Sequence, residues 1–121
     1  MATESGIEPD VPLTPAVFHI LLALSEGERH GYAIMREVTE LTGGGIRLGP
    51  GTLYGTLKRL LAAGLVEEAE ERADTDHVDE RRRYYRLTNS GDMTVRAEAR
   101  RLESLVDAAR RKRLLTPERG G

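Results

Sequence analysis

The segment DTDHVDE, residues 74–80, holds the side chains best suited to ligate a metal ion. Carboxylates and a histidine so close together could bind a divalent cation. The segment lacks the mid-loop glycine and the distant glutamate of an EF-hand loop, and runs of like charge are usually solvated. We therefore favour a solvated, flexible loop without a metal, and no cofactor is expected. The candidate ligands are Asp74, Asp76, His77, Asp79 and Glu80.

Catalytic groups are otherwise scarce in this sequence. There is no cysteine, which excludes a thiol nucleophile, a disulfide framework and a cysteine-based zinc site. His19 and His30 have no carboxylate or cysteine at ligand spacing, and no serine, histidine and aspartate combine on a rigid element. The sequence therefore predicts a protein that is not an enzyme.

The composition is typical of a cytoplasmic protein. The lack of cysteine fits a reducing compartment. Residues 1–12 are acidic and have no apolar centre like that of a signal peptide, and the longest apolar run, AVFHILLAL, is too short to span a bilayer. A chain of 121 residues is most simply one unit with a modest core.

Close approach to a polyanion is indicated by GPGTLYGTLKRLLAAGLV, residues 49–66. On a helical wheel of about 100° per residue, its leucines share one side. The other side carries small residues, hydroxyls and cations, and no Asp or Glu occurs between Leu41 and Glu67. Small side chains let a helix near a DNA groove, hydroxyls bind phosphates, and arginine reads guanine. The predicted DNA-binding residues here are Gly51, Thr52, Tyr54, Gly55, Thr56, Lys58 and Arg59, with Arg59 expected at a base edge.

A plainer interpretation of the same helix remains open. Gly51 and Gly55 could merely ease packing, and Lys58 and Arg59 could be ordinary solvated charges. The DNA-binding interpretation requires this side of the helix to face outward rather than into the fold.

Three helices are predicted in the first half of the chain. The first covers residues 15–24 after the N-cap Thr14, and the second covers 31–41, where apolar residues recur at helical spacing. The third starts near Pro50 and ends at Gly64, a residue type that favours the left-handed conformation at a helix C-terminus.

A β-hairpin and a long helix are predicted in the second half. Residues 65–71 and 82–88 read as its strands, and the long helix covers 88–115 from the N-cap Thr88. Three helices followed by a hairpin wing define a winged helix-turn-helix, so the fold is predicted to be mainly α. The hairpin tip is acidic, but its base is basic, and Arg82 and Arg83 are predicted to hold phosphates.

The long helix carries an apolar stripe that could pack on its own core or on a second copy. The helix is too long to be covered by so small a domain, which favours a homodimer. The residues predicted at the dimer interface are Phe18, His19, Val95, Ala99, Leu102, Leu105, Val106 and Ala109.

Three motifs, HGYAI, GTLYGTLKRLLAAGLV and RRYYRLTNSG, occur in that order. At these separations the chain resembles the PadR family of bacterial winged-helix transcriptional regulators, from residue 14 to about residue 110. The single short C-terminal helix is similar to the smaller PadR subfamily, in which that helix dimerises. In relatives, small aromatic or drug-like molecules near the dimer interface can relieve repression, whereas aromatic residues are scarce here.

The resemblance also implies roles for particular residues. Tyr32, which is predicted to hold a DNA phosphate, follows Gly31 as in the family's pair at the start of the second helix. Tyr54 matches a phosphate contact in the family's recognition helix. Tyr85, Leu87, Thr88 and Gly91 match the end of the wing and the turn into the last helix. Two departures are Gly55, where the family often has proline, and the acidic wing tip, which is often basic in relatives.

The sequence thus predicts a homodimeric DNA-binding transcriptional regulator. A repressor that binds a pseudo-palindromic operator and is released by an unknown signal is expected. The alternative is a winged-helix module that binds other proteins, which the acidic wing tip would suit. The predicted organisation is a disordered arm at 1–12, a DNA-binding domain at 13–88, a dimerisation helix at 89–115 and a disordered tail at 116–121.

Overall fold

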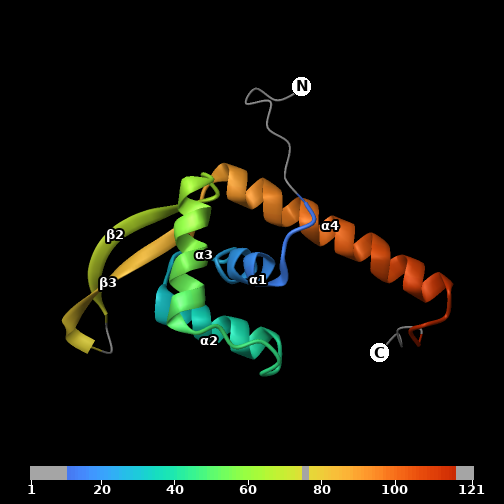
Figure 1. Ribbon diagram of the computed structural model, residues 1–121, viewed down its shortest axis with the longest axis horizontal. Coiled ribbons are helices and arrows are strands. Elements are labelled where there is room, and N and C mark those ends of the chain that lie inside the picture. The colour runs from blue at the N-terminus through green and yellow to red at the C-terminus, as the bar shows by residue number, and fades with distance from the viewer. Residues whose placement is uncertain (1–10, 75–76, 117–121) are drawn as a thin grey trace.

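The computed structural model describes the backbone of residues 11–74 and 77–116, and the side chains of these residues except 70–82. The predicted terminal arm at 1–12 and tail at 116–121 lie almost wholly outside these limits. The elements follow the order α1, β1, α2, α3, β2, β3 and α4 (Figure 1). Four helices and one small antiparallel sheet confirm the mainly α, winged helix-turn-helix prediction.

The first two helices begin at local hydrogen-bond caps. The Thr14 hydroxyl accepts from the Val17 amide at 3.3 Å and starts α1, Pro15–Ala23. His30 Nδ1 accepts from the Ala33 amide at 3.1 Å and starts α2, Gly31–Leu41. Both caps satisfy amides that have no partner inside the first helical turn. The predicted helix starts are confirmed.

The third helix, α3, spans Pro50–Ala62 with Gly49 as its N-cap. It ends as predicted, because Gly64 adopts a φ of +78°, which a residue without a Cβ reaches without strain. The chain then enters β2, Val66–Asp74, which pairs antiparallel with β3, His77–Leu87. Both strands are longer than predicted.

A third strand, β1, was not among the predicted elements. It consists only of Arg29–His30 and pairs with Tyr84 and Tyr85 of β3, so that the sheet order is β1-β3-β2. The pairing ties the start of α2 to the wing, the name used below for the β2–β3 hairpin.

The last helix, α4, spans Asn89–Arg111 and lies across α1. Its C-terminal half projects beyond the other elements (Figure 1). One core joins all the helices and the sheet base, and its central side chains are Ile20, Leu21, Leu24, Ile34, Val38, Leu53, Leu57, Leu60, Val66, Tyr85 and Val95.

Val95 corrects one prediction about the dimer. It was predicted to contact a second copy, but only 5% of it is exposed because it packs into the core of its own chain. Thr94 and Glu98 of the same half of α4 are also buried. An apolar stripe shows which face of a helix is covered, but not whether the cover is the same chain or a partner.

Candidate nucleic-acid interface

The face of α3 that points away from the core is the predicted DNA-binding face. Leu53, Leu57 and Leu60 are buried on the opposite side. Gly51, Thr52, Tyr54, Lys58 and Arg59 are exposed and Gly55 is half-buried, so six of the seven predicted residues share accessible surface. These six are called the open face of α3 below.

The two glycines of the open face are not needed for packing within the chain. A Cβ built at Gly51 or at Gly55 would have no neighbouring atom within 4 Å. Glycine in a helix interior costs roughly 1 kcal/mol relative to alanine, so Gly55 weakens α3, and neither glycine eases any contact in the described fold. The interpretation that they ease internal packing is therefore wrong.

Thr56 is the exception and corrects the prediction that it binds DNA. Only 2% of it is exposed, because it lies on the buried side of α3 with Leu53 and Leu60. Its hydroxyl accepts a hydrogen bond from Arg59 Nη2 at 3.3 Å. Thr56 thus orients Arg59 from the buried side of α3 and does not itself reach the surface.

The cations of the open face are not neutralised by carboxylates. Among the residues that the structure describes, neither Lys58 nor Arg59 has an Asp or Glu oxygen within 4 Å. No acidic residue occurs between Leu41 and Glu67, so the nearby chain supplies none. The open face therefore carries positive charge that remains available to an external anion.

Tyr54 and Gly31 lock α3 against the start of α2. A Cβ at Gly31 would overlap the hydroxyl and ring of Tyr54, so a larger residue there would force the Tyr54 side chain to move. Next to it, Tyr32 is half-exposed, and the Arg36 guanidinium lies 5.3 Å from the centre of its ring. Arg36 is an exposed cation beside the predicted phosphate contact that the sequence analysis did not single out.

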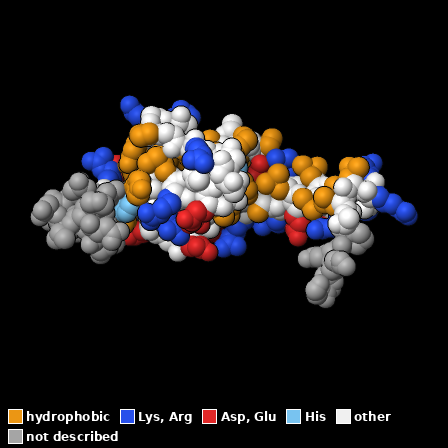
Figure 2. Space-filling model, turned by 90° about the horizontal axis from the view of Figure 1, so that it is seen from below, with side chains coloured by type: hydrophobic (Ala, Val, Ile, Leu, Met, Phe, Trp, Pro, Cys, Tyr) orange, Lys and Arg blue, Asp and Glu red, His pale blue; other side chains and the backbone are white. Residues whose placement is uncertain are grey.

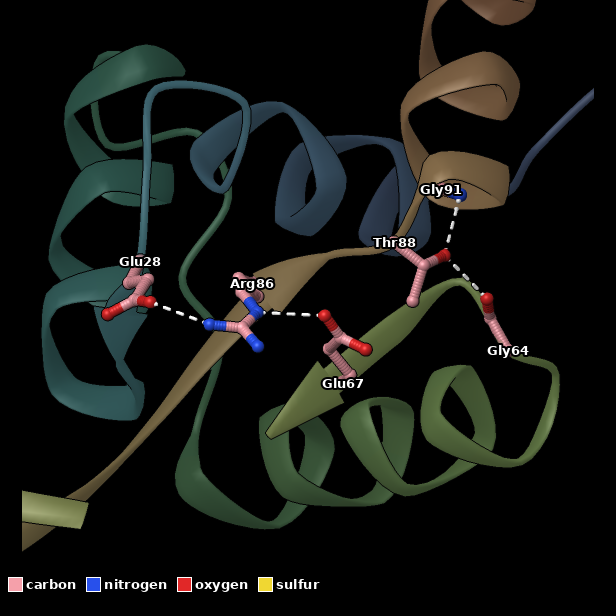
Figure 3. Close-up of polar contacts among 6 residues, drawn as sticks. All are labelled: Glu28, Gly64, Glu67, Arg86, Thr88 and Gly91. Carbon is pink, nitrogen blue, oxygen red and sulfur yellow. Dashed lines mark hydrogen bonds and ion pairs between the residues drawn. The ribbon is translucent and has the colours of Figure 1, made fainter. Parts of the chain in front are cut away.

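The arginines of the wing differ from the cations of α3. Arg86 Nε lies 2.8 Å from Glu67 and its Nη1 lies 3.0 Å from Glu28 (Figure 3). The hydrogen bonds to Glu67 and Glu28 raise the pKa of Arg86. Arg83 Nη1 lies 3.6 Å from Glu68. The side chain of Arg82 lies outside the described residues, so its predicted phosphate contact stays a prediction.

A hollow of about 260 Å³ separates α3 from the wing. Tyr54 and Lys58 line it from α3, and Glu68, Arg83 and Tyr85 line it from the strands. Burial raises the pKa of the Tyr85 phenol, with a smaller contribution from Tyr54. The hollow lies beside the open face of α3, and residues of both α3 and the wing border it.

The acidic loop DTDHVDE lies in the part of the chain whose side chains are not described. Its solvated state and its lack of a metal therefore remain predictions. Elsewhere, within the described side chains, no three His, Asp or Glu residues gather as metal ligands would. The described helices also include none that is long and apolar enough to cross a membrane.

The projecting half of α4 carries the most exposed of the remaining predicted dimer contacts. Leu105 is 56% exposed and Val106 is 39% exposed, and Leu114 and Leu115 are exposed beyond them. Apolar side chains gather on this end of the molecule, at the right of Figure 2. Ala99 is exposed, and the other predicted residues, Phe18, His19, Leu102 and Ala109, are half-buried.

The buried half of α4 contains a carboxylate that the sequence analysis missed. Glu98 is 2% exposed and accepts from Arg101 Nε at 2.7 Å, from Arg101 Nη2 at 2.8 Å and from the Leu13 amide at 3.2 Å. The bonds from Arg101, followed by that from Leu13, hold the pKa of Glu98 below its usual value against the opposing effect of burial. Glu98 fixes the chain before α1 to α4.

The fold and the cationic helix face together define a winged helix-turn-helix protein. The family model described as the transcriptional regulator PadR-like family matches residues 20–97. The chain belongs to this family and is a transcriptional regulator rather than an enzyme.

Two relatives and one solved structure resemble the chain. It is 42% identical over 89 residues to the transcriptional regulator Rv3488 of Mycobacterium tuberculosis, covering 73% of this chain and 76% of that protein. It is 40% identical over 86 residues to an uncharacterized 37.1 kDa protein in a transposon of Streptomyces fradiae, and the match spans 71% of this chain but 22% of that protein. Bacillus subtilis PadR in complex with operator DNA is 24% identical with a TM-score of 0.60, over 71% of this chain and 47% of that one.

Proposed function

We propose that the protein is a homodimeric repressor that binds a pseudo-palindromic operator through the open face of α3. The observation that carries this proposal is the pair Gly51 and Gly55, whose Cβ positions meet open space. They lie beside two cations, Lys58 and Arg59, that pair with no carboxylate among the described side chains. Such a surface weakens the helix and serves no internal contact, but it suits the close approach of a polyanion. A fold shared with Bacillus subtilis PadR, whose structure contains operator DNA, supports the same use.

The proposed DNA-binding residues divide into one that contacts a base and others that contact the backbone or allow close approach. Arg59, oriented by Thr56, contacts a base edge, and Lys58 binds a backbone phosphate. The remaining proposed phosphate or close-approach residues are Tyr32, Gly51, Thr52, Tyr54, Gly55, Arg82 and Arg83. Arg86 is left out of this set because two carboxylates already occupy it.

Dimerisation through the projecting half of α4 completes the proposed assembly. Residues 13–88, with the buried half of α4, form the DNA-binding domain, and the later turns of α4 pair with a second copy. The proposed contacts are Phe18, His19, Ala99, Leu102, Leu105, Val106 and Ala109. Two copies would place their α3 helices in major grooves about one helical turn, ~10 base pairs, apart. A signal that changes this spacing would release the operator.

The proposal is tested by selecting the bound fragments from host genomic DNA with the purified protein. An enriched palindrome beside a promoter, and lower transcription from it in the presence of the protein, are expected. Failure to bind both the selected fragments and the protein's own upstream region at low salt would reject DNA binding. A protein-interaction module, which the acidic wing would suit, would then be favoured.

A further inference from the structure

The wing presents two faces that use their charges differently. Side chains alternate between faces along a strand, and Glu68 pairs in register with Tyr85. Glu68, Arg83 and Tyr85 therefore share the face that lines the hollow beside α3. Glu67 and Arg86, which also pair in register, lie on the other face, where Arg86 bridges to Glu28 (Figure 3).

The ion pair in the hollow is loose and partly solvated. Arg83 Nη1 and Glu68 Oε2 are 3.6 Å apart, and about half of each side chain is exposed, 56% and 44%. By contrast, Arg86 Nε lies 2.8 Å from Glu67 on the other face. Exposed ion pairs typically contribute less than about 1 kcal/mol, so another anion can displace Glu68 at little cost.

The hollow also brings in a cation from α3. Lys58 and Tyr54 line it together with Arg83, and in the described part of the chain Lys58 has no carboxylate within ion-pair distance. Two cations from two elements thus border one space together with Tyr54, and Glu68 is the one carboxylate among the lining side chains that the structure describes. A phosphate can accept from an arginine in the same forked geometry as a carboxylate.

We propose that a backbone phosphate of bound DNA enters this hollow and replaces Glu68 as the partner of Arg83. Glu68 is then an internal competitor that lowers DNA affinity, and the inference rests on the proposed function. In the wild-type protein Arg83 exchanges one anion for another. The salt dependence of binding follows the number of phosphates that newly available positive charges neutralise. Because Arg83 already has an anionic partner before DNA binds, it adds little to this dependence.

The test is a DNA-binding titration of Glu68→Gln by fluorescence anisotropy. Phosphate contacts are independent of sequence, so the probe is a labelled duplex of mixed sequence, titrated between about 50 and 200 mM salt. We expect affinity to rise about two- to five-fold, because this change corresponds to the free energy that an exposed ion pair typically contributes. The slope of log affinity against log salt should steepen by about 0.9, as for one added phosphate contact.

Two further variants connect the gain to Arg83. Glu103→Gln removes the same charge from the exposed surface of α4, away from the hollow, and should leave affinity unchanged. Arg83→Ala should weaken the wild type only slightly, but it should abolish the gain in the Glu68→Gln background. Thermal melts of all variants should coincide, because neither residue of the pair is buried.

Each other result overturns the proposal. No gain from Glu68→Gln, an equal gain from Glu103→Gln, or a gain that survives Arg83→Ala would show that Glu68 does not compete for Arg83. If the wild type binds the duplex and only these differences fail, the proposed function stands without this inference. If the wild type binds no duplex at the lowest salt, the proposed function itself fails.

Discussion

Helices α3 and α4 share one core but leave opposite kinds of surface uncovered. Both are amphipathic, and both bury apolar side chains among the same neighbours. The uncovered face of α3 is small and cationic, with glycines at positions 51 and 55. The uncovered end of α4 instead exposes Leu105 and Val106.

The uncovered surfaces of α3 and α4, rather than their buried surfaces, therefore indicate which kind of partner each helix can bind. Apolar area gains free energy when removed from water, so the end of α4 suits another apolar surface. Cations without a described carboxylate partner, on a helix face of small residues, suit a polyanion. Changes confined to either surface should therefore separate self-association from DNA binding.

The largest effect is expected from Leu105→Glu. A carboxylate placed in each copy of the proposed interface would be buried without a partner, at a cost of at least about 3 kcal/mol, and should dissociate the dimer. The measurement is the molar mass by light scattering at micromolar concentration. Ser104→Glu, which adds the same charge at the next exposed position of α4, should remain dimeric. A wild-type protein that is already monomeric would contradict the dimer.

A smaller effect is expected from Arg59→Ala on the open face of α3. Loss of a base-edge contact should weaken operator binding by about 1–3 kcal/mol and relax specificity at one position. Lys58→Ala should instead weaken all duplexes alike and reduce the salt slope by about one. Titrations with an operator and a mixed-sequence duplex measure both. Equal losses on the two duplexes for both variants would contradict this division of roles.

The buried half of α4 should respond to Glu98→Gln through stability. The isosteric amide keeps the shape but loses the charge-assisted bonds, so unfolding free energy should fall by about 1 kcal/mol near neutral pH. The pKa of Glu98 is lowered in the folded state. Its stabilisation is therefore present above its unfolded pKa, about 4.3, and is lost as pH falls through the lower folded value. Urea titrations should show the two proteins converging with acidification.

Glu103→Gln is the matched control for that comparison, because Glu103 is exposed on the same helix. It should change stability little at any pH. A Glu98→Gln deficit that stays constant far below pH ~4 would contradict a charged carboxylate as its cause.

The smallest effect is expected from Gly55→Ala, and its two consequences have opposite signs. Alanine should stabilise α3 by up to about 1 kcal/mol, since its Cβ meets open space. The same methyl group should weaken DNA binding by holding the helix farther from the groove. Thermal melts and anisotropy titrations of one preparation measure both. Improved stability with unchanged affinity would mean that the open face does not approach DNA closely.

Local signals made much of the fold predictable. Thr14 and Thr88 are caps whose hydroxyls accept from amides three residues later, and Gly64 ends α3 by its own backbone preference. Strand β1 could not be predicted, because Arg29 and His30 carry no strand signal and become a strand only by pairing with residues more than fifty positions away.

The errors at the candidate site have different physical causes. Thr56 was assigned by its hydroxyl, although the helical wheel puts it only about 60° from Leu53, on the inward side. Val95 was assigned from a stripe that cannot distinguish its own core from a partner. Glu98 was missed because the Leu13 amide that it binds lies 85 residues away in sequence. The outward orientation of the open face was predicted correctly because it depends on spacing within one helix.

The junction between α3 and α4 is tightly packed and hydrogen-bonded. The Thr88 hydroxyl donates to the Gly64 carbonyl at 2.6 Å and accepts from the Gly91 amide at 3.0 Å (Figure 3). A Cβ at Gly91 would overlap the Leu65 carbonyl oxygen, so the first turn of α4 sits directly against the short connection between α3 and β2. A torque applied to the far end of α4 would therefore turn α3 with it instead of being absorbed in a loose connection.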